Sequence, residues 1–473
     1  MVYYGWKTIA AVIPVTLFFA GCASWPEFVA VLSRPDSELK SSVTALGFVE
    51  SVYVFFVFVP SPFAKMVWQV LGIKSTFLTG VAISLLGLAI SSIAPSVTFL
   101  TLSRGMLVGF GACLALTPIT FLLADWFPWE HRFHVLATSV RYLVNPLGSV
   151  VFVNIFRWIN DSFGWRYNFL FLITYGSCTC GILVPILRHP KPCESQNTKP
   201  KKTQCSDASW SVMSKTVIVV LWMWISFGKA LGLTAFYTIM VKYGEDMGYD
   251  SLTATHPLTA EGITACLSRA ITSFFGDHIK GYFLHMYVVC TALLSLAHLL
   301  LPFAKVPVAV IMFGAVVGAG QGPIVAGWYA ACNEVLGGES VHTFFILLLV
   351  SWGLGRTTGS LLPGLIVDFH QEYSLLFFIL GTSYGSMAVS LLVIIELNRR
   401  HMSNQKSSNF FTQPEKRVSP PDKCTLDKNK HLSEVESVLM QTKHDQSNLE
   451  RKPLAVSTPH IHYTYEEIQP KRN

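Results

Sequence analysis

The segment RHPKPCESQNTKPKKTQCSDASWSVMSK, residues 188–215, divides this chain. It is polar, contains proline and carries a cluster of lysines, whereas long apolar stretches lie on both sides of it. Polar, proline-containing stretches between apolar segments are typical of loops. All other connections before residue 397 are short. The segment therefore predicts two apolar halves, residues 1–187 and 216–396, that are joined by one basic loop.

The composition indicates a membrane protein. Of the 473 residues, 51% are hydrophobic and only 13% are charged, whereas about a quarter of the residues of an average soluble domain are charged. The charged residues gather in the 188–215 loop and after residue 397. The formal net charge of +7 therefore belongs to a loop and a tail. It does not indicate a surface for nucleic acid.

Apolar windows of about 20 residues are long enough to cross a bilayer as helices. They predict an all-α membrane protein with twelve transmembrane helices, six in each half. The start, MVYYGW, leads directly into a long apolar run, which predicts a retained first span and no cleaved leader. The predicted helices cover residues 8–32, 43–64, 75–94, 98–123, 134–156, 166–187, 216–241, 256–276, 283–303, 308–332, 342–367 and 375–396.

The distribution of positive charge predicts the orientation. If both termini are cytosolic, Lys65, Lys74 and Lys280 fall on the cytosolic side with the lysines of the 188–215 loop, and fewer cations fall on the other side. The positive-inside rule favours this arrangement. The tail, 397–473, is rich in Lys, Glu, Ser, Gln and Pro, and we expect it to be disordered and cytosolic. The plasma membrane is the expected location.

Two six-helix halves with a cytosolic connecting loop are the pattern of the major facilitator fold, in which the halves rock about a site near the midplane. Specific residues resemble the monocarboxylate porter family of that superfamily. They are RGMLVGFGACLALTP at 104–118, LATSVRYLVNP at 136–146, FGWRYNFLFL at 163–172 and Arg269 in the eighth predicted helix. The resemblance extends from residue 4 to about residue 396.

The resemblance implies a secondary transporter that moves a small organic anion by alternating access. It implies neither an enzyme nor a cofactor, and the sequence offers no ATP-binding loop and no cysteine spacing of a metal site. The expected partners are a carboxylate or amino-acid-like substrate and the lipid bilayer. Members of the family often use a single-span chaperone glycoprotein, and such a partner is open here.

Two departures from the family leave proton coupling open. Its proton-coupled members have an aspartate four residues before the arginine of helix eight, where this chain has Ala265. They also have a lysine after the proline of helix one, whereas Glu27 follows Pro26 here. Proton symport is therefore one alternative.

Ionisable residues within the predicted spans mark the candidate site. Such residues are expensive in a bilayer unless they are paired, face a cavity or reach the surface. Arg269 is the preferred carboxylate ligand, because a guanidinium can hold a carboxylate with two hydrogen bonds. Arg104, nearer a helix end, is expected to reach the surface or to pack. The predicted substrate-binding residues are Arg269, Lys229, Arg141, Arg356 and Asn145, and the candidates for proton coupling are Glu261, Glu27 and Glu50.

Several alternatives remain open at this level. Arg141 stands where the family usually has a small residue, so it could narrow the substrate pathway or change the charge along it. Glu261 could titrate during transport, or it could form a static pair with Lys229 or another cation. The three glutamates fall in the outer half of the bundle above a basic site, which would also suit a facilitator of amino acids or related zwitterions. A non-transporting membrane sensor or scaffold that signals through the loop and the tail is the rival from another class.

Overall fold

The computed structural model describes residues 4–33, 39, 41–188, 190, 212–304, 306–337, 341–370 and 372–411. All regular elements in these ranges are helical. Most of the basic 188–215 loop and the tail from 412 lie outside the described residues, so the predictions made for them stay predictions. One compact unit, Met1–Gln405, contains both predicted halves.

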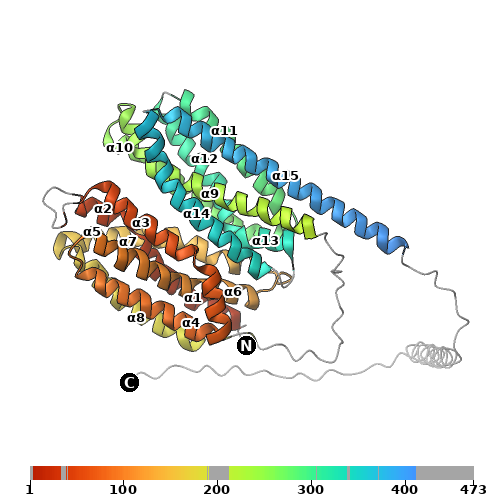
Figure 1. The fold of residues 1–473 in the computed structure, drawn as a ribbon, viewed down its shortest axis with the longest axis horizontal. Helices are drawn as coiled ribbons and strands as arrows, with labels where there is room; N and C mark the ends of the chain where they lie inside the picture. Colours follow the sequence, from red (N-terminus) through yellow and green to blue (C-terminus); the bar gives the residue numbers. More distant parts are fainter. Residues whose placement is uncertain are drawn as a thin grey trace, which may run out of the picture. The chain divides into compact units, whose positions relative to one another are not determined.

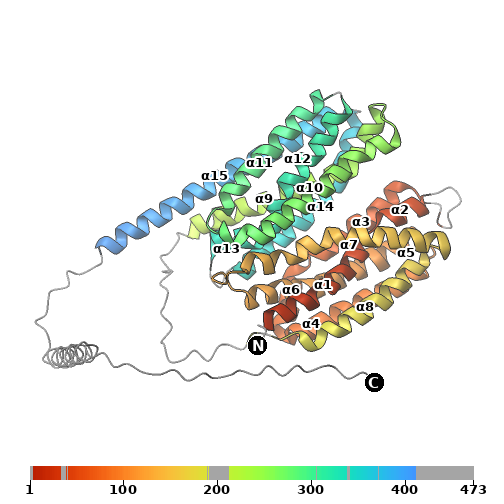
Figure 2. The same cartoon turned by 180° about the vertical axis from the view of Figure 1, so that it is seen from behind.

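The first half contains the elements from α1 to α8, and the second contains those from α9 to α15 (Figures 1 and 2). In the first half, the elements are α1 Tyr4–Ala23, α2 Pro26–Leu32, α3 Val43–Phe58, α4 Ser61–Ser92, α5 Val97–Leu100, the π-helical η1 Thr101–Val108, α6 Gly109–Trp126, α7 His134–Ser162 and α8 Arg166–Ile186. In the second half, they are α9 Val212–Asp246, α10 Ser251–Phe275, η2 Gly276–His278, α11 Phe283–Leu300, η3 Leu301–Phe303, α12 Pro307–Ala326, α13 Trp328–Leu336, α14 Val341–His370 and α15 Tyr373–Phe411.

Ten helices among the described residues are long and apolar enough to cross a membrane, so the protein is a multi-pass membrane protein. A helix occupies each of the twelve predicted segments. The two segments that are not among the ten are in α3, whose apolar stretch Thr44–Phe58 is shorter, and in α10. Length and composition therefore support ten membrane-spanning helices among the described residues, whereas twelve were predicted.

Local geometry departs from the predicted segments at several places. The first predicted helix is broken between α1 and α2 at Ser24 and Trp25. The predicted 75–94 helix begins earlier, in α4, and the chain bends there at Gly72, where φ is 78° and ψ is 166°. Glycine adopts a positive φ without steric cost. The last helix, α15, continues to Phe411 instead of ending at 396.

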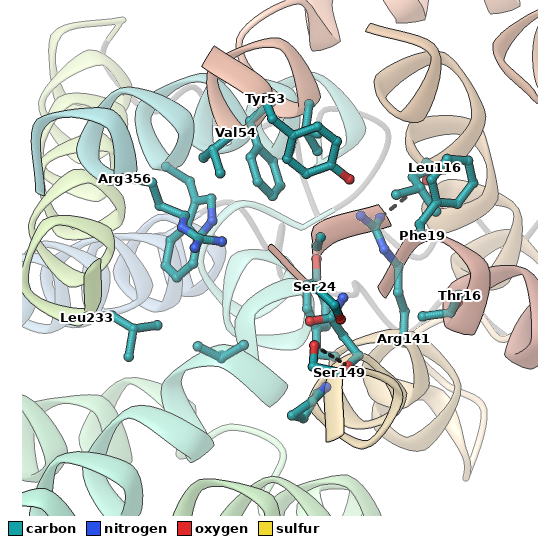
Figure 3. A pocket seen from close by; sticks show the side chains of 18 of the residues that line it. Thr16, Phe19, Ser24, Tyr53, Val54, Leu116, Arg141, Ser149, Leu233 and Arg356 are labelled. Atoms are coloured by element: carbon teal, nitrogen blue, oxygen red, sulfur yellow. Dashed lines mark hydrogen bonds between the residues drawn. The ribbon is translucent and has the colours of Figure 1, made fainter. Parts of the chain in front are cut away.

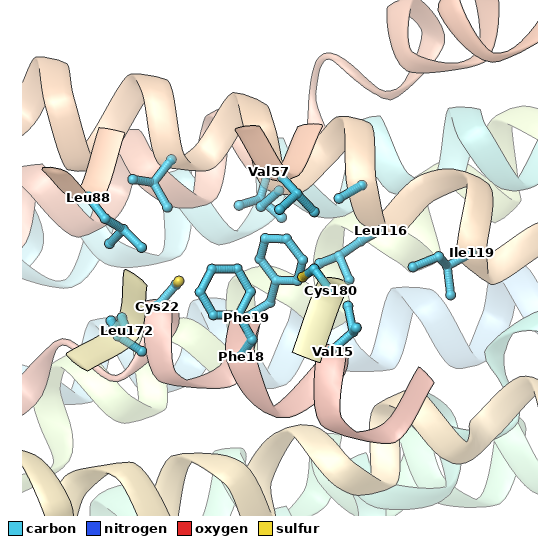
Figure 4. Packing of buried hydrophobic residues seen from close by; sticks show 14 of the residues in the cluster. Val15, Phe18, Phe19, Cys22, Val57, Leu88, Leu116, Ile119, Leu172 and Cys180 are labelled. Atoms are coloured by element: carbon cyan, nitrogen blue, oxygen red, sulfur yellow. The ribbon is translucent and has the colours of Figure 1, made fainter. Parts of the chain in front are cut away.

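Apolar side chains of α1, α3, α4, α6 and α8 form the core of the first half (Figure 4). Phe18 and Phe19 of α1 lie within this core at 0% and 3% exposure. Glycines let α4 and α6 approach closely, since a Cβ at Gly80 would lie 2.6 Å from the carbonyl oxygen of Gly111. Close approach through small residues is the usual way in which membrane helices pack.

The two halves touch through α14 against α3 and through α10 against α7. Polar contacts join them within the bundle, where Ser51 Oγ and Ser360 Oγ lie 2.8 Å apart, and at the end that holds Lys65 and Lys280, which we call the Lys65 end. There, Lys65 Nζ donates to Thr343 Oγ1 at 2.7 Å, and Lys280 Nζ donates to the carbonyl oxygen of His131 at 2.8 Å. His342 Nε2 lies 3.6 Å from Asp125 Oδ1. These contacts hold the halves together at the Lys65 end.

Candidate functional site

A cavity of about 430 Å³ lies between the two halves. Both halves line it, with residues of α1, α2, α3, α6 and α7 on one side and of α9, α10, α12, α13 and α14 on the other (Figure 3). The ionisable and amide side chains in the lining are those of Glu50, Arg141, Asn145, Arg269 and Arg356. Four of the five predicted substrate-binding residues, all except Lys229, therefore line one cavity.

Arg269 of α10 is buried, with 8% of its surface exposed. Ser268, the residue before Arg269, attaches α10 to α12, since its Oγ donates to the carbonyl oxygen of Gly318 at 3.1 Å. The Arg269 side chain crosses to the other half, where Nη1 donates to the carbonyl oxygen of Tyr142 at 3.4 Å. Its buried Nε has no hydrogen-bond partner among the described residues. The guanidinium therefore holds an unsatisfied donor in a side chain that lines the cavity.

Arg356 of α14 and Arg141 of α7 reach the cavity from opposite halves (Figure 3). Arg141 Nη1 donates to Thr120 Oγ1 at 2.6 Å and, at 3.3 Å, to the carbonyl oxygen of Leu116. These two bonds hold one edge of the Arg141 guanidinium against α6. Arg356 Nε is buried without a partner among the described residues.

Glu50, a candidate for proton coupling, is paired. Arg104 Nη2 donates to Glu50 Oε2 at 2.8 Å and to the carbonyl oxygen of Cys22 at 2.9 Å. The Arg104 guanidinium also lies 4.0 Å from the ring centroid of Trp25 and 4.7 Å from that of Tyr53. At 2% exposure, Arg104 does not reach the surface. Of the two alternatives expected for it, packing is the one that the structure shows.

Glu27 is also paired. Its Oε1 accepts a hydrogen bond of 3.0 Å from Arg157 Nη2, within the first half. The Arg157 side chain is 64% exposed, whereas that of Glu27 is 12% exposed. Pro26, which precedes Glu27, lines the cavity, but Glu27 does not.

Lys229 lies behind the wall of the cavity. It is buried at 1% exposure in α9, and its Nζ lies 3.7 Å from the ring centroid of Trp328 and 4.9 Å from that of Trp352. Both tryptophans line the cavity, whereas Lys229 does not. A cation over an aromatic ring is attracted by the ring's quadrupole. The alternative of a static pair with Glu261 is not realised, since no described carboxylate forms an ion pair with Lys229.

Glu261 also lies behind the wall, at 1% exposure. Its Oε2 accepts a hydrogen bond of 2.7 Å from the hydroxyl of Tyr237, and its Oε1 has no partner among the described residues. Tyr237 itself lines the cavity. One hydroxyl therefore connects the buried carboxylate to the cavity.

The charges in the lining are unbalanced. Three arginines face one glutamate, a formal charge of +2. The aromatic part of the wall, which includes Tyr53, Tyr142, Trp328 and Trp352, was not predicted from the sequence. Aromatic residues make up 13% of the chain, so their abundance alone did not distinguish these positions. The cavity combines cationic and aromatic walls, which suits an organic anion.

A model of the major facilitator superfamily matches residues 1–285. Solved structures agree on the fold. A variant of the E. coli fucose:proton symporter FucP matches with a TM-score of 0.60 at 13% identity, over 82% of this chain and 98% of that one. FucP in the outward conformation matches with a TM-score of 0.58 at 13% identity, over 81% of this chain and 98% of that one. The chain belongs to the major facilitator superfamily.

The curated relatives that match this chain include monocarboxylate transporters. Human monocarboxylate transporter 2 is 19% identical over 455 residues, which are 91% of this chain and 93% of the relative. Monocarboxylate transporter 13 of Bos taurus is 24% identical over 359 residues, which are 75% and 80% of the two chains. Within the superfamily, the chain is monocarboxylate transporter-like. It is a secondary transporter and not an enzyme.

Proposed function

We propose that this transporter carries small organic anions, and that Arg269 binds the carboxylate group of the substrate in the central cavity. The observation that carries the proposal is the buried Arg269 Nε, which has no partner among the described residues, at the wall of a cavity shared by both halves. A desolvated guanidinium with available donors binds a carboxylate strongly. The names of the relatives, monocarboxylate transporters, support a carboxylate as the substrate.

The other lining residues have supporting roles in this proposal. Arg356 and Arg141 add positive charge, and Asn145 adds an amide that can bond either a carboxylate or a hydroxyl of the substrate. Lys229 acts through Trp328 and Trp352, because these rings separate it from the cavity. The substrate therefore shares the cavity with three guanidinium groups.

Glu261 is the carboxylate that we assign to proton binding if transport is coupled to protons. Glu50 and Glu27 are each held by an arginine, whereas Glu261 has only the hydroxyl of Tyr237 and an unpartnered oxygen. A neutral carboxyl group can fill that environment by donating a hydrogen bond from its own O–H. Tyr237 then provides the route between this group and the substrate.

The proposed topology has twelve spans, six in residues 1–187 and six in 216–396. It adds α3 and α10 to the ten apolar helices. Glu261 and Arg269 make α10 more polar, but both side chains are buried inside the protein. Charged groups that face a protein interior are compatible with a spanning helix. Both termini and the Lys65 end face the cytosol, and the plasma membrane is the proposed location.

The arrangement of contacts supports alternating access. Lys65, Lys280 and His342 join the halves at the end that we assign to the cytosol. A transporter that is held closed at its cytosolic end exposes its central site to the opposite side. We therefore infer that this conformation faces outward, and that the contacts at the Lys65 end must break for release into the cell.

The test is uptake of labelled monocarboxylates and amino acids into vesicles that contain the purified full chain. Arg269→Gln should lower kcat/KM for the transported carboxylate about 10- to 100-fold, because a hydrogen bond to a charged group is worth about 1.5–3 kcal/mol. The matched control is Arg132→Gln, which changes an exposed arginine outside the cavity lining. Equal losses in the two variants, or carboxylate uptake that Arg269→Gln leaves unchanged, would show that Arg269 does not bind the substrate.

The same vesicles test the role of Glu261. An inward proton gradient should stimulate uptake by the wild type, and Glu261→Gln should lose this stimulation while it still exchanges substrate across the membrane. Stimulation that survives Glu261→Gln would assign proton binding to another group. Exchange without any effect of the gradient in the wild type would identify a facilitator.

A further inference from the structure

The cations of the cavity come from both halves of the protein. Arg141 belongs to α7 of the first half, whereas Arg269 and Arg356 belong to α10 and α14 of the second. In Figure 3, the guanidinium groups of Arg141 and Arg356 lie on different sides of the cavity. A carboxylate bound at Arg356 therefore leaves the Arg141 guanidinium, on another side of the cavity, without an anion.

The protein supplies little counter-charge for these cations. Glu50 is the one acid among the described lining residues, and Arg104 already holds its carboxylate from behind the wall. When the buried groups directly behind the wall, Arg104, Lys229 and Glu261, are counted with the lining, five cations share two glutamates, a formal charge of +3. Buried cations that lack a counter-ion are costly. One monocarboxylate would offset only part of this charge.

Arg141 has donors to offer. A guanidinium carries five N–H groups, and Arg141 uses Nη1 for its bonds to Thr120 and Leu116. No described residue accepts a hydrogen bond from its Nε or Nη2. The bonds of Nη1 fix the direction of the group, and the side chain lines the cavity, where its remaining donors can meet an anion. This is the geometry of a ready-made anion site.

The cavity also has room for a longer solute. Its volume of about 430 Å³ is many times the share of about 30 Å³ that one water molecule occupies in the liquid. Pockets of about 300–1,000 Å³ hold ligands larger than a two- or three-carbon acid. Aromatic side chains such as Tyr53 and Trp352 supply an apolar wall between the charged groups.

We propose that the substrate is a dicarboxylate, with one carboxylate at Arg269 and Arg356 and the other at Arg141. This rests on the proposed carboxylate transport and makes Arg141 the residue that selects the second charge. Such a substrate bridges the two halves.

The experiment measures binding to the purified full chain in detergent, by thermal stabilisation with sodium succinate and with sodium propionate at equal ionic strength. The wild type should bind succinate at least 10-fold more tightly than propionate. Arg141→Gln should lower this ratio at least 10-fold, Arg141→Lys should restore part of it, and the exposed Arg132→Gln should leave it unchanged. Uptake of labelled succinate and propionate into vesicles should show the same order.

Each other outcome overturns the inference. Propionate that binds as well as succinate, or a ratio that Arg141→Gln leaves unchanged, excludes a second carboxylate at Arg141. If Arg141→Gln does not fold, Arg141→Lys and the wild type still give the ratio on which the inference depends. If Arg269→Gln abolishes propionate binding but the wild type does not prefer succinate, the dicarboxylate inference is overturned while the carboxylate site at Arg269 stands. A wild type that binds neither acid would overturn the proposed carboxylate site as well.

Discussion

Arg104 in the first half and Arg269 in the second are both buried arginines in predicted spans, at 2% and 8% exposure, but their surroundings differ. Arg104 has a carboxylate, a carbonyl oxygen and two aromatic rings as partners, and its buried Nη1 has no partner among the described residues. Arg269 has one long hydrogen bond to a carbonyl oxygen and an Nε without a described partner. Arg104 has a carboxylate of the protein as its counter-ion and is therefore structural, whereas Arg269 lines the cavity and forms no ion pair with a described carboxylate, which marks a place for a ligand anion.

The ion pair between Arg104 and Glu50 can be broken by substituting the glutamate. Glu50→Ala leaves Arg104 buried without its carboxylate, and removing one partner of a buried pair costs about 3–5 kcal/mol. We expect a loss near the lower end, about 3 kcal/mol, because the Glu50 side chain is 28% exposed toward the cavity. The measurement is the fraction of monodisperse protein that remains after graded heating. Unchanged stability would show that the pair is not structural.

A smaller effect is expected at the unpaired lysine of the second half. Lys229→Met keeps a long side chain between Trp328 and Trp352 but removes the charge. The loss of a cation–π contact, worth up to about 2 kcal/mol, is offset because a buried cation no longer has to be desolvated. The unfolding free energy should stay equal or rise by about 1 kcal/mol. A large loss of stability would show an unrecognised anionic partner of Lys229.

The same variant tests whether Lys229 contacts the substrate. Because the tryptophans separate Lys229 from the cavity, Lys229→Met should lower carboxylate uptake less than Arg269→Gln does. Equal losses in the two variants would place Lys229 in direct contact with the substrate and would mean that Trp328 and Trp352 move apart during transport.

The smallest effect is expected for the Glu27–Arg157 pair of the first half, in which the arginine is exposed and Glu27 is 12% exposed. Glu27→Ala removes the partner of Arg157, which is 64% exposed. Exposed ion pairs contribute about 0–1 kcal/mol, and salt screens them. The same heating assay should show a shift below about 1 kcal/mol that shrinks further at high salt. A salt-independent loss as large as that of Glu50→Ala would contradict the distinction between buried and exposed pairs.

Much of the fold could be predicted because apolar length is a property of the sequence itself. A helix occupies every predicted segment, and the positions of the segments follow from runs of apolar residues. The break at Ser24 and the π-helical η1 could not be predicted in this way. They depend on which neighbouring helix the chain contacts, and hydropathy averages over such detail.

Only part of the candidate site could be predicted from the sequence. Arg141, Asn145, Arg269 and Arg356 could be chosen as residues that are costly in a bilayer, and they line one cavity. The partner of Arg104 could not be chosen, since Glu50 lies 54 residues away in another helix. The tryptophans that cover Lys229 belong to α13 and α14. Pairing between distant helices decides which charges reach the cavity, and a single sequence does not contain it.

The bend in α4 has a consequence that concerns handedness. A Cβ at Gly72 would meet no atom within 4 Å, so size alone does not exclude a larger residue there. What excludes an L-amino acid is the backbone, because φ is 78°. The mirror image of this conformation is an ordinary extended one. A D-alanine introduced at position 72 by semisynthesis should therefore fit the bend, whereas an L-alanine of the same size should strain it.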